Sequence, residues 1–340
     1  MVWVVNPMWR RPETMAHETD VVAGAAGIDQ RGGAATALPT LPNFFIVGAP
    51  KCATTSMDAY LAAHPEIYMA PRKEPHFFAR DLYPEGVGCS AEAYGRLFEG
   101  VTGEPVVGES SVFYMLSQTA ARAIHDARPD AKILIMLRDP IEVVASHHSQ
   151  IIFEGLEDEP DLARALALEA ARRAEHGAGA LTYQEKVLHY RDVVAFADQV
   201  ARFQALFPPE QIKVVLFEDV KADLPGVYGE ILEFLGVDPT FQPTFKVQNA
   251  NKRLRSARLG AFLRETPGWV TALGRVVLPS AAWRYKTRMF LKRLNTDFRR
   301  REPMAPALRA HLATELGPQV RRLETLLDRD LSHWARARRD

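Results

Sequence analysis

The stretch between residues 44 and 63 constrains the fold of this chain more than any other part. It opens with Phe-Phe-Ile-Val at 44–47, an apolar run that is typical of a strand buried in a parallel sheet. A loop containing Gly48 and Pro50 comes next, and apolar residues then recur at helical spacing from Thr55 to Ala63. A buried strand, a tight loop and a helix in this order predict the first unit of an α/β fold.

Similar apolar runs recur along the chain and alternate with helical segments. The clearest is Ala-Lys-Ile-Leu-Ile-Met-Leu at 131–137, and a helix is predicted from Ile141, shortly after it. Because strands that alternate with helices form parallel sheets with right-handed crossovers, we predict an α/β fold with a parallel central sheet flanked by helices. The other predicted strands are 67–69, 106–107 and 212–217, and another helix is predicted at 228–235.

Composition divides the chain into a leader and one large domain. Residues 1–42 contain a run rich in glycine and alanine and end at Pro39 and Pro42, so we predict a disordered leader. A single domain is predicted over 43–340, with a mainly helical insertion at about 156–207. Residues 252–301 hold fourteen Lys or Arg against two acidic residues. A solvated surface is the favoured interpretation of this stretch, and contact with an anionic glycan or a membrane surface stays open.

Bulk composition excludes several classes of protein. The 42 basic and 42 acidic side chains balance, so the chain is not a globally basic nucleic-acid binder. The two cysteines, Cys52 and Cys89, form neither a disulfide framework nor a zinc motif, which favours a reducing, cytoplasmic location. No apolar run reaches the roughly 18–20 residues that would span a bilayer. The sequence therefore predicts a cytoplasmic protein without a transmembrane segment and leaves the oligomeric state open.

The loop at 48–56, Gly-Ala-Pro-Lys-Cys-Ala-Thr-Thr-Ser, has the chemistry of an anion site. A helix that starts directly after a strand presents backbone N–H groups and its positive dipole end, and Lys51 and the hydroxyls at 54–56 add to these. The Walker A pattern does not match, because it requires glycine at 53 and lysine at 54, where the chain has Ala53 and Thr54. The alternative of an ordinary capped helix start explains Thr54 and Thr55 but leaves Lys51 unexplained.

The run FFIVGAPKCATTSMDAYLAAHPEI resembles the sulfotransferases of the heparan-sulfate and bacterial type, which use 3′-phosphoadenosine 5′-phosphosulfate (PAPS). In that family a strand is followed by G-x-x-K-x-x-T-[TS]-[SAL], and the resemblance extends from residue 43 to about 335. It implies a P-loop-like nucleotide-binding fold, a reaction without a metal ion, and release of 3′-phosphoadenosine 5′-phosphate (PAP). It also implies that the phosphosulfate is bound by Gly48, Pro50, Lys51, Cys52, Ala53, Thr54, Thr55 and Ser56.

A second family motif follows the predicted strand at 131–137. Family members have R-[DN]-P-x-x-R-x-x-S here, and Arg138 and Ser146 match the residues that hold the 3′-phosphate. A guanidinium at a strand end can grip phosphate with two hydrogen bonds, and a serine about two helical turns later can face the same pocket. Val143 replaces the family's second arginine, so one contact or salt bridge is expected to be missing. The family's late basic loop is matched by Lys252 and Arg253, which are predicted to cover the 3′-phosphoadenosine; an ordinary solvated loop is the alternative.

Between the two phosphate motifs stands Arg-Lys-Glu-Pro-His-Phe-Phe at 72–78, where heparan-sulfate-type enzymes have K-E-x-x-F-F with a glutamate base. An acceptor hydroxyl is a weak nucleophile near neutral pH, and a positioned carboxylate can take its proton. We predict Glu74 as the base, with a surface ion pair as its alternative role. His76 is the second candidate, with a packed histidine as the alternative. Lys51 is predicted to stabilise the leaving phosphate, and at 108–114, the acceptor side by resemblance, Ser110 replaces a frequent active-site lysine.

The sequence thus predicts a sulfotransferase that moves a sulfuryl group from PAPS to a hydroxyl or amine of an acceptor. The acceptor stays open among a glycan, a glycolipid and a small hydroxylated metabolite. One alternative is a non-catalytic module that binds PAP or another anion, which Ser110 and Val143 leave open. A P-loop kinase is the other alternative, and the missing Walker lysine and Mg²⁺-binding carboxylate count against it.

Overall fold

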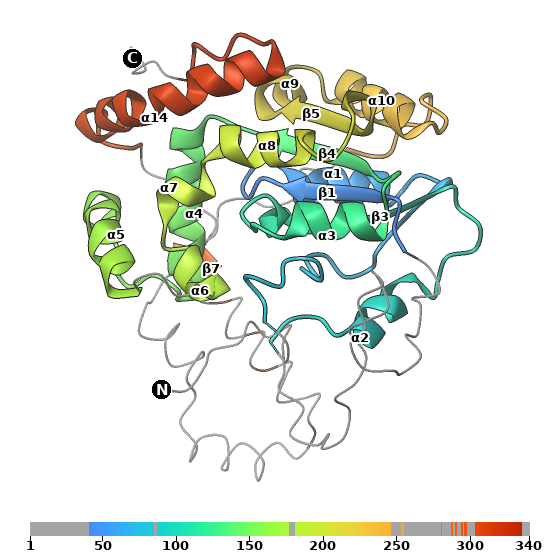
Figure 1. The fold of residues 1–340 in the computed structure, drawn as a ribbon, viewed down its shortest axis with the longest axis horizontal. Helices are drawn as coiled ribbons and strands as arrows, with labels where there is room; N and C mark the ends of the chain where they lie inside the picture. The colour runs from blue at the N-terminus through green and yellow to red at the C-terminus, as the bar shows by residue number, and fades with distance from the viewer. Residues whose placement is uncertain are drawn as a thin grey trace.

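The structure is a computed structural model that describes residues 41–84, 87–176, 181–245, 253–254, 296–297 and 303–334, and single positions at 280, 287, 290 and 294. Its central sheet has five parallel strands in the order β2-β3-β1-β4-β5 (Figure 1). All five strands predicted from apolar runs are present, and the predicted parallel α/β fold is confirmed. The strands are β1 (Phe44–Gly48), β2 (Ile67–Met69), β3 (Val106–Ser110), β4 (Lys132–Leu137) and β5 (Ile212–Leu216).

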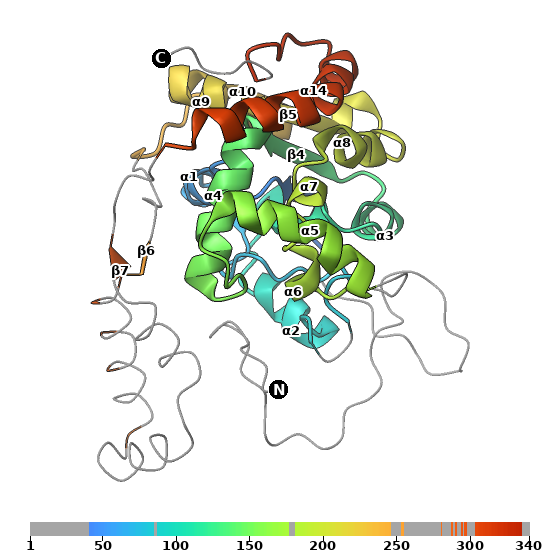
Figure 2. The ribbon, with the colours of Figure 1, turned by 90° about the vertical axis from the view of Figure 1, so that its left-hand side faces the viewer.

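Helices flank this sheet on both faces. Figure 2 shows α1 on one side of β4, with α3 and α8 on the other. The longer helices are α1 (Thr54–Leu61), α3 (Ala120–Ala127), α4 (Pro140–Glu154), α5 (Leu162–His176), α8 (Phe196–Gln204), α10 (Leu224–Leu235) and α14 (Pro306–Leu327). The shorter ones are α2 (Ala91–Gly95), α6 (Tyr183–Lys186), α7 (Tyr190–Val193) and α9 (Phe217–Ala222), and 3₁₀ turns lie at Arg96–Phe98, Val112–Tyr114 and Pro209–Gln211.

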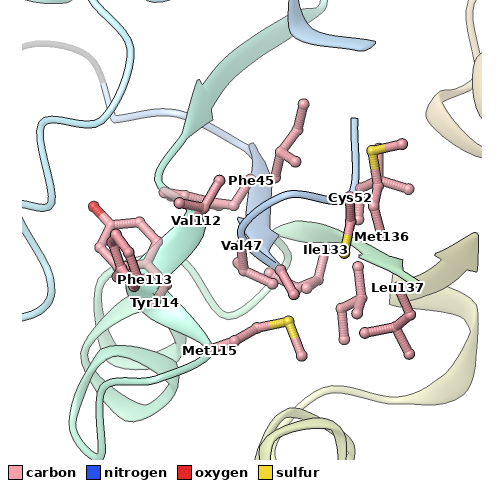
Figure 3. Packing of buried hydrophobic residues seen from close by; sticks show 14 of the residues in the cluster. Phe45, Val47, Cys52, Val112, Phe113, Tyr114, Met115, Ile133, Met136 and Leu137 are labelled. Carbon is pink, nitrogen blue, oxygen red and sulfur yellow. The ribbon is translucent and has the colours of Figure 1, made fainter. Parts of the chain in front are cut away.

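The central strands β1 and β4 form the middle of the hydrophobic core. Every residue of β1 is buried, and in β4 only Lys132 is partly exposed. Because helices cover both faces, side chains of both alternating sets meet apolar neighbours, which explains the uninterrupted apolar runs. Figure 3 shows part of this core, with Val47 of β1, Cys52 of the loop after β1, and Met136 of β4.

The start and end of α4 follow from its terminal residues. The Asp139 side chain caps the helix by accepting a hydrogen bond of 2.9 Å from the backbone N–H of Ile141. Pro140 occupies the first helical position, where its missing N–H costs little. Gly155 ends the helix with a left-handed φ of 76°. The first turns of α4 are thereby fixed directly after the end of β4.

Three further features bear on the sequence predictions. The segment predicted as a helical insertion contains α5, α6, α7 and α8. A small antiparallel pair, β6 (Arg253–Leu254) and β7 (Thr296–Asp297), approaches α4 through β6. Residues 1–40 of the predicted leader and Lys252 lie outside the described residues. Within the described part of the chain, no helix is both long and apolar enough to cross a membrane.

Candidate active site

The loops after β1, β3 and β4 meet at the carboxyl edge of the sheet. The backbone N–H of Ala49 donates to the carbonyl of Met136 at 2.7 Å, which joins the ends of β1 and β4. On the other side of β1, the N–H of Ser111 donates to the carbonyl of Ile46 at 3.0 Å. In open parallel sheets, ligands bind in crevices outside the carboxyl ends of the strands. This edge is therefore the candidate site.

The loop after β1 has a backbone conformation that is costly for its residues. Lys51 and Ala53 have positive φ angles of 66° and 68°. Gly48 has a φ of 149°, and a Cβ there would lie 2.7 Å from the carbonyl oxygen of Val112, so the position requires glycine. Loops that place residues in the left-handed region turn successive N–H groups toward one point and bind anions. The conformation supports an anion site at the start of α1.

The first turn of α1 has no side-chain cap. Its N-cap residue is Ala53, and Thr54, Thr55 and Ser56 stand inside the helix. The ordinary capped helix start considered from the sequence is therefore wrong. Thr54 is buried, while the Thr55 and Ser56 side chains are partly exposed. Their hydroxyls add to the N–H groups that the first turn of any helix leaves without intrahelical acceptors.

Lys51 and Cys52 point in different directions from this loop. The Lys51 ammonium donates a hydrogen bond of 3.1 Å to Oε1 of Gln150 on α4. The Cys52 side chain is fully buried, and its thiol donates to the carbonyl of Pro50 at 3.4 Å. Burial raises the pKa of the Cys52 thiol far above its usual range, although the charge of Arg138 opposes this. Lys51 can present charge to a ligand, whereas Cys52 can offer only its backbone.

Arg138 is the first residue after β4, as the sequence predicted. Its guanidinium lies 4.7 Å from the centroid of the Phe217 ring, and its Nη2 lies 3.4 Å from Oε2 of Glu142. That distance is long for a charged pair. The Arg138 side chain is 22% exposed, so an anion can reach it. Ser146 lies two turns into α4 and is buried.

Val143 adds no polar contact beside Arg138, but an arginine from the far end of the chain does. Val143 is fully buried in the core. Arg309 of α14 donates to Oδ2 of Asp139 at 2.8 Å and to Oε1 of Glu142 at 2.7 Å. Sequence reasoning missed Arg309, because 170 residues separate it from Asp139. The available signal was a cation three residues before Leu312, on the buried face of an amphipathic helix.

Glu74 lies between Lys73 and His76. Its Oε1 is 3.6 Å from Nζ of Lys73, and its Oε2 is 3.6 Å from Nε2 of His76. Its backbone N–H donates to the carbonyl of Ser110 at 2.8 Å, at the end of β3. Burial raises the pKa of Glu74, but the hydrogen bond with His76 and the charge of Lys73 outweigh it and lower the pKa to about 2. Glu74 is thus ionised at neutral pH, as a proton acceptor must be.

Ser110 stands where the resemblance leads one to expect a lysine, but a lysine from another loop supplies an ammonium group there. Nζ of Lys73 donates to Oγ of Ser110 at 2.8 Å. Lys73 therefore brings a positive charge to the end of β3 and, through its contact with Glu74, to the candidate base.

His76 is packed into the protein. It is 4% exposed, and its ring stacks on Tyr83 with centroids 4.6 Å apart. Burial lowers the pKa of His76, so the ring is neutral at pH 7. Among the described residues, its Nδ1 has no hydrogen-bond partner. The packing agrees with the packed-histidine alternative, and the contact with Glu74 lets the ring orient the carboxylate.

Several residues of this site have strained backbone conformations. Glu74 and His76 have positive φ angles of 61° and 52°, as Lys51 and Ala53 do in the first loop. Asp328 is the other described non-glycine residue with positive φ, at the end of α14. Strained residues persist where the surrounding structure holds them, and they concentrate at functional sites.

Sequence reasoning also missed Asp58 on α1. Burial raises the pKa of Asp58 to about 6, with the charge of Lys73 opposing the shift and that of Glu74 adding to it. The ionisation of Asp58 is thus coupled to the charges of Lys73 and of the candidate base. The available signal was its position one helical turn after Thr54.

The remaining predicted residues have different outcomes. Lys252 lies outside the described residues, and Arg253 is placed in β6, opposite Asp297 of β7, without a described side chain. His147 and His148 are buried, and their Nε2 atoms bond backbone carbonyls at 2.8 and 2.9 Å. Over the described ranges, no group of three or more His, Cys, Asp or Glu side chains could hold a metal ion. A reaction without metal remains a prediction.

The fold and site define a parallel α/β protein with a candidate anion-binding loop and a candidate base at one sheet edge. The family model for the sulfotransferase domain matches residues 41–256, more than half of the chain. The chain belongs to this family, which confirms the predicted resemblance and supports sulfotransfer activity.

Individual relatives agree with this assignment. A crystal structure of a sulfotransferase from Alicyclobacillus acidocaldarius is 34% identical, with a TM-score of 0.64 over 87% of this chain and 100% of that chain. Heparan sulfate glucosamine 3-O-sulfotransferase 6 from Mus musculus is 28% identical over 198 residues, 58% of this chain and 52% of the relative. Membrane-associated sulfotransferase kil1 from Dictyostelium discoideum is 34% identical over 105 residues, 30% of this chain and 21% of the relative. The matches span about half or less of these curated relatives.

Proposed function

We propose that this protein transfers a sulfuryl group from PAPS to a hydroxyl or amine of an acceptor. Family membership supports sulfotransfer, and the site supports this donor. The observation that carries the proposal is the meeting of two features at one edge of the sheet. The strained loop with Lys51 is suited to an anion, and the ionised Glu74 is suited to accept a proton.

The residues at this edge fit a nucleotide that carries anionic groups at both ends. The loop from Gly48 to Ser56 offers N–H groups, hydroxyls and Lys51 to a phosphosulfate. Arg138 follows the neighbouring strand and is partly exposed, which suits a 3′-phosphate. We propose Ser146 as a second contact to that phosphate, and Arg253 near α4 as part of the adenosine cover.

PAPS supplies an activated sulfuryl group, whose bond to the phosphate oxygen breaks as the acceptor oxygen or nitrogen bonds to sulfur. We assign to Glu74 the proton that the acceptor loses. Because its pKa of about 2 makes Glu74 a weak base, that proton moves as the new bond forms rather than before it. Lys51 balances the charge that develops on the phosphate oxygen. The neutral His76 holds the Glu74 carboxylate in place.

The acceptor is proposed to be a hydroxylated glycan, a glycolipid or a small metabolite. Relatives named for heparan sulfate and carbohydrate support the glycan. The ammonium of Lys73 beside Ser110 would suit an acceptor that carries an anionic group. We propose a cytoplasmic location, because both cysteines are free and buried, as a reducing compartment allows.

Two measurements test the proposal. PAP should raise the melting temperature far more than ATP at equal concentration, because a ligand that binds the native state stabilises it. Equal shifts with ATP and PAP would overturn the assignment of the 3′-phosphate to Arg138. Incubation with labelled PAPS and a mixture of acceptors should release PAP and label an acceptor. Stabilisation by PAP without any transfer would instead favour the non-catalytic binding module.

A further inference from the structure

We propose that Arg309 is a positioning residue that keeps the Arg138 guanidinium available to the 3′-phosphate by binding the competing carboxylate of Glu142. The inference rests on the proposed function, in which Arg138 contacts that phosphate. Arg309 lies beyond residues 41–256, the range that the family model matches. It reaches the site from α14, the last helix of the structure.

Glu142 divides its two oxygens unequally between two arginines. Its Oε1 accepts from Arg309 at 2.7 Å, whereas its Oε2 is 3.4 Å from Arg138. The second arm of Arg309 donates to Asp139 at 2.8 Å. The Arg309 side chain is only 10% exposed, so solvent and salt screen these pairs weakly. The short contacts are thus made by Arg309, and Arg138 keeps a loose one.

A count of charges shows what Arg309 does for an anionic ligand. In the described contacts, the positive charges of Arg138 and Arg309 stand against the negative charges of Asp139 and Glu142. Removal of Arg309 would take one positive charge away from beside the proposed phosphate position. The Glu142 carboxylate would also be drawn to Arg138, whose donors are those that a phosphate would use.

A purely structural role for Arg309 is the competing explanation. α14 packs on α4 and α8 through its buried apolar face, and Figure 2 shows it crossing the end of α4. Arg309 could simply pin α14 to Asp139. The two roles differ in what removing the Glu142 charge would do. If Arg309 acts by neutralising Glu142, removing the Glu142 charge should restore the 3′-phosphate contact that is lost in an Arg309 variant. If Arg309 only holds α14 against Asp139, removing that charge should restore nothing.

The test compares four variants of the full chain: Arg309→Gln, Glu142→Gln, their combination, and Arg322→Gln as the matched control. Arg322 lies on the same helix and pairs with Asp198, away from the site. Calorimetry would measure the affinities for PAP and for adenosine 5′-phosphate, which lacks the 3′-phosphate. The ratio of the two affinities isolates the 3′-phosphate contact from general damage to the fold.

We expect Arg309→Gln to lower the preference for PAP by roughly tenfold, the scale of coupling between charged neighbours. The double variant should restore the preference to within about threefold of the wild type. Glu142→Gln alone should bind PAP at least as tightly as the wild type, and Arg322→Gln should match it. Glu142→Gln also tests the idea if Arg309→Gln fails to fold, because a tenfold loss of PAP affinity there would overturn it.

Other outcomes also decide between the explanations. An unchanged preference in Arg309→Gln, or a double variant as weak as the single one, would overturn the positioning role and leave the proposed function intact. A wild type that binds PAP and adenosine 5′-phosphate equally would overturn the proposed 3′-phosphate contact, and this inference would fall with it.

Discussion

Oε2 of Glu74 lies 3.6 Å from Nε2 of His76, and the Glu74 side chain is much more exposed to solvent than that of His76. The His76 side chain is 5% exposed, while that of Glu74 is 34% exposed. An acceptor can therefore reach the carboxylate more easily than the imidazole. This relationship favours Glu74 as the group that takes the proton and His76 as the group that holds it.

Glu74→Gln should separate binding from turnover. Glutamine keeps the shape and can keep the contact with His76 but cannot accept a proton, so PAP affinity should stay nearly unchanged. The turnover number should fall by about 10²-fold or more, the scale of general-base catalysis. Steady-state kinetics with PAPS and calorimetry with PAP would measure the two effects. Glu92→Gln, an exposed acid on α2, is the control that should leave both unchanged.

The substitution His76→Ala is expected to destabilise the fold, so its turnover must be corrected for the fraction of protein that is folded. Because His76 is buried against Tyr83, His76→Ala should lower the free energy of unfolding by roughly 2 kcal/mol through the cavity it leaves. Once corrected for the folded fraction, its turnover should exceed that of Glu74→Gln. An inactive but folded His76→Ala beside an active Glu74→Gln would transfer the role of base to His76.

Lys51→Ala should damage binding and turnover together. The ammonium is proposed to contact the cofactor before and during transfer, so the loss in kcat/KM should exceed the loss in kcat. Gln150→Ala is the matched control, because it removes the 3.1 Å contact with Lys51 but leaves the ammonium in place. Its effect on kcat should stay within about threefold of the wild type. Equal losses in the two variants would show that Lys51 acts through Gln150 and not on the cofactor.

Removal of residues 1–40 should leave the fold and the PAP affinity intact. The hydrophobic core of the described part of the chain begins at Phe44 of β1 and ends at Trp334. The predicted leader lacks the apolar periodicity of a core-forming segment, and such a segment contributes little to stability. The melting temperature and the PAP affinity of the shortened protein check the prediction, and a large fall in melting temperature would show that the leader belongs to the fold.

The sequence was sufficient for those features that depend on local pattern. Uninterrupted apolar runs predicted β1 and β4 because both faces of these strands are covered. The loop from Gly48 to Ser56 could be located because glycine, lysine and hydroxyl residues stand in a fixed local order. The alternative of Thr54 and Thr55 as caps, which the sequence disfavoured but could not exclude, is ruled out by Ala53 as the N-cap residue in a left-handed conformation.

Features that depend on contacts between distant segments could not be predicted. Arg309 meets Asp139 across 170 residues, and Lys73 meets Ser110 across 37. Lys73 meets Ser110 because the parallel strands β2 and β3 end at the same edge of the sheet, and Arg309 meets Asp139 because α14 packs on α4. No spacing in the chain encodes either contact. The loss of arginine at Val143 was visible in the sequence, but the cation from α14 was not.

His147 should make the protein less stable in acid. Burial is the main reason that the pKa of His147 falls from 6.5 to about 4, and the charges of Lys51 and His148 add to it. Above pH 6.5 the ring is neutral in both the folded and the unfolded chain, so it imposes no penalty. Below pH 6.5 the unfolded chain binds the proton more readily, and stability is lost progressively down to about pH 4.

His147→Gln removes this titration while its amide can still donate to the carbonyl of Val187, as Nε2 of His147 does at 2.8 Å. Between pH 7.5 and pH 5 the wild type should therefore lose ~2 kcal/mol more unfolding free energy than the variant. Urea unfolding at the two pH values measures the difference, and the other titrating groups cancel in the comparison. If His147→Gln and the wild type lose stability in parallel, His147 is protonated in the folded protein and its burial has been overcome by a partner.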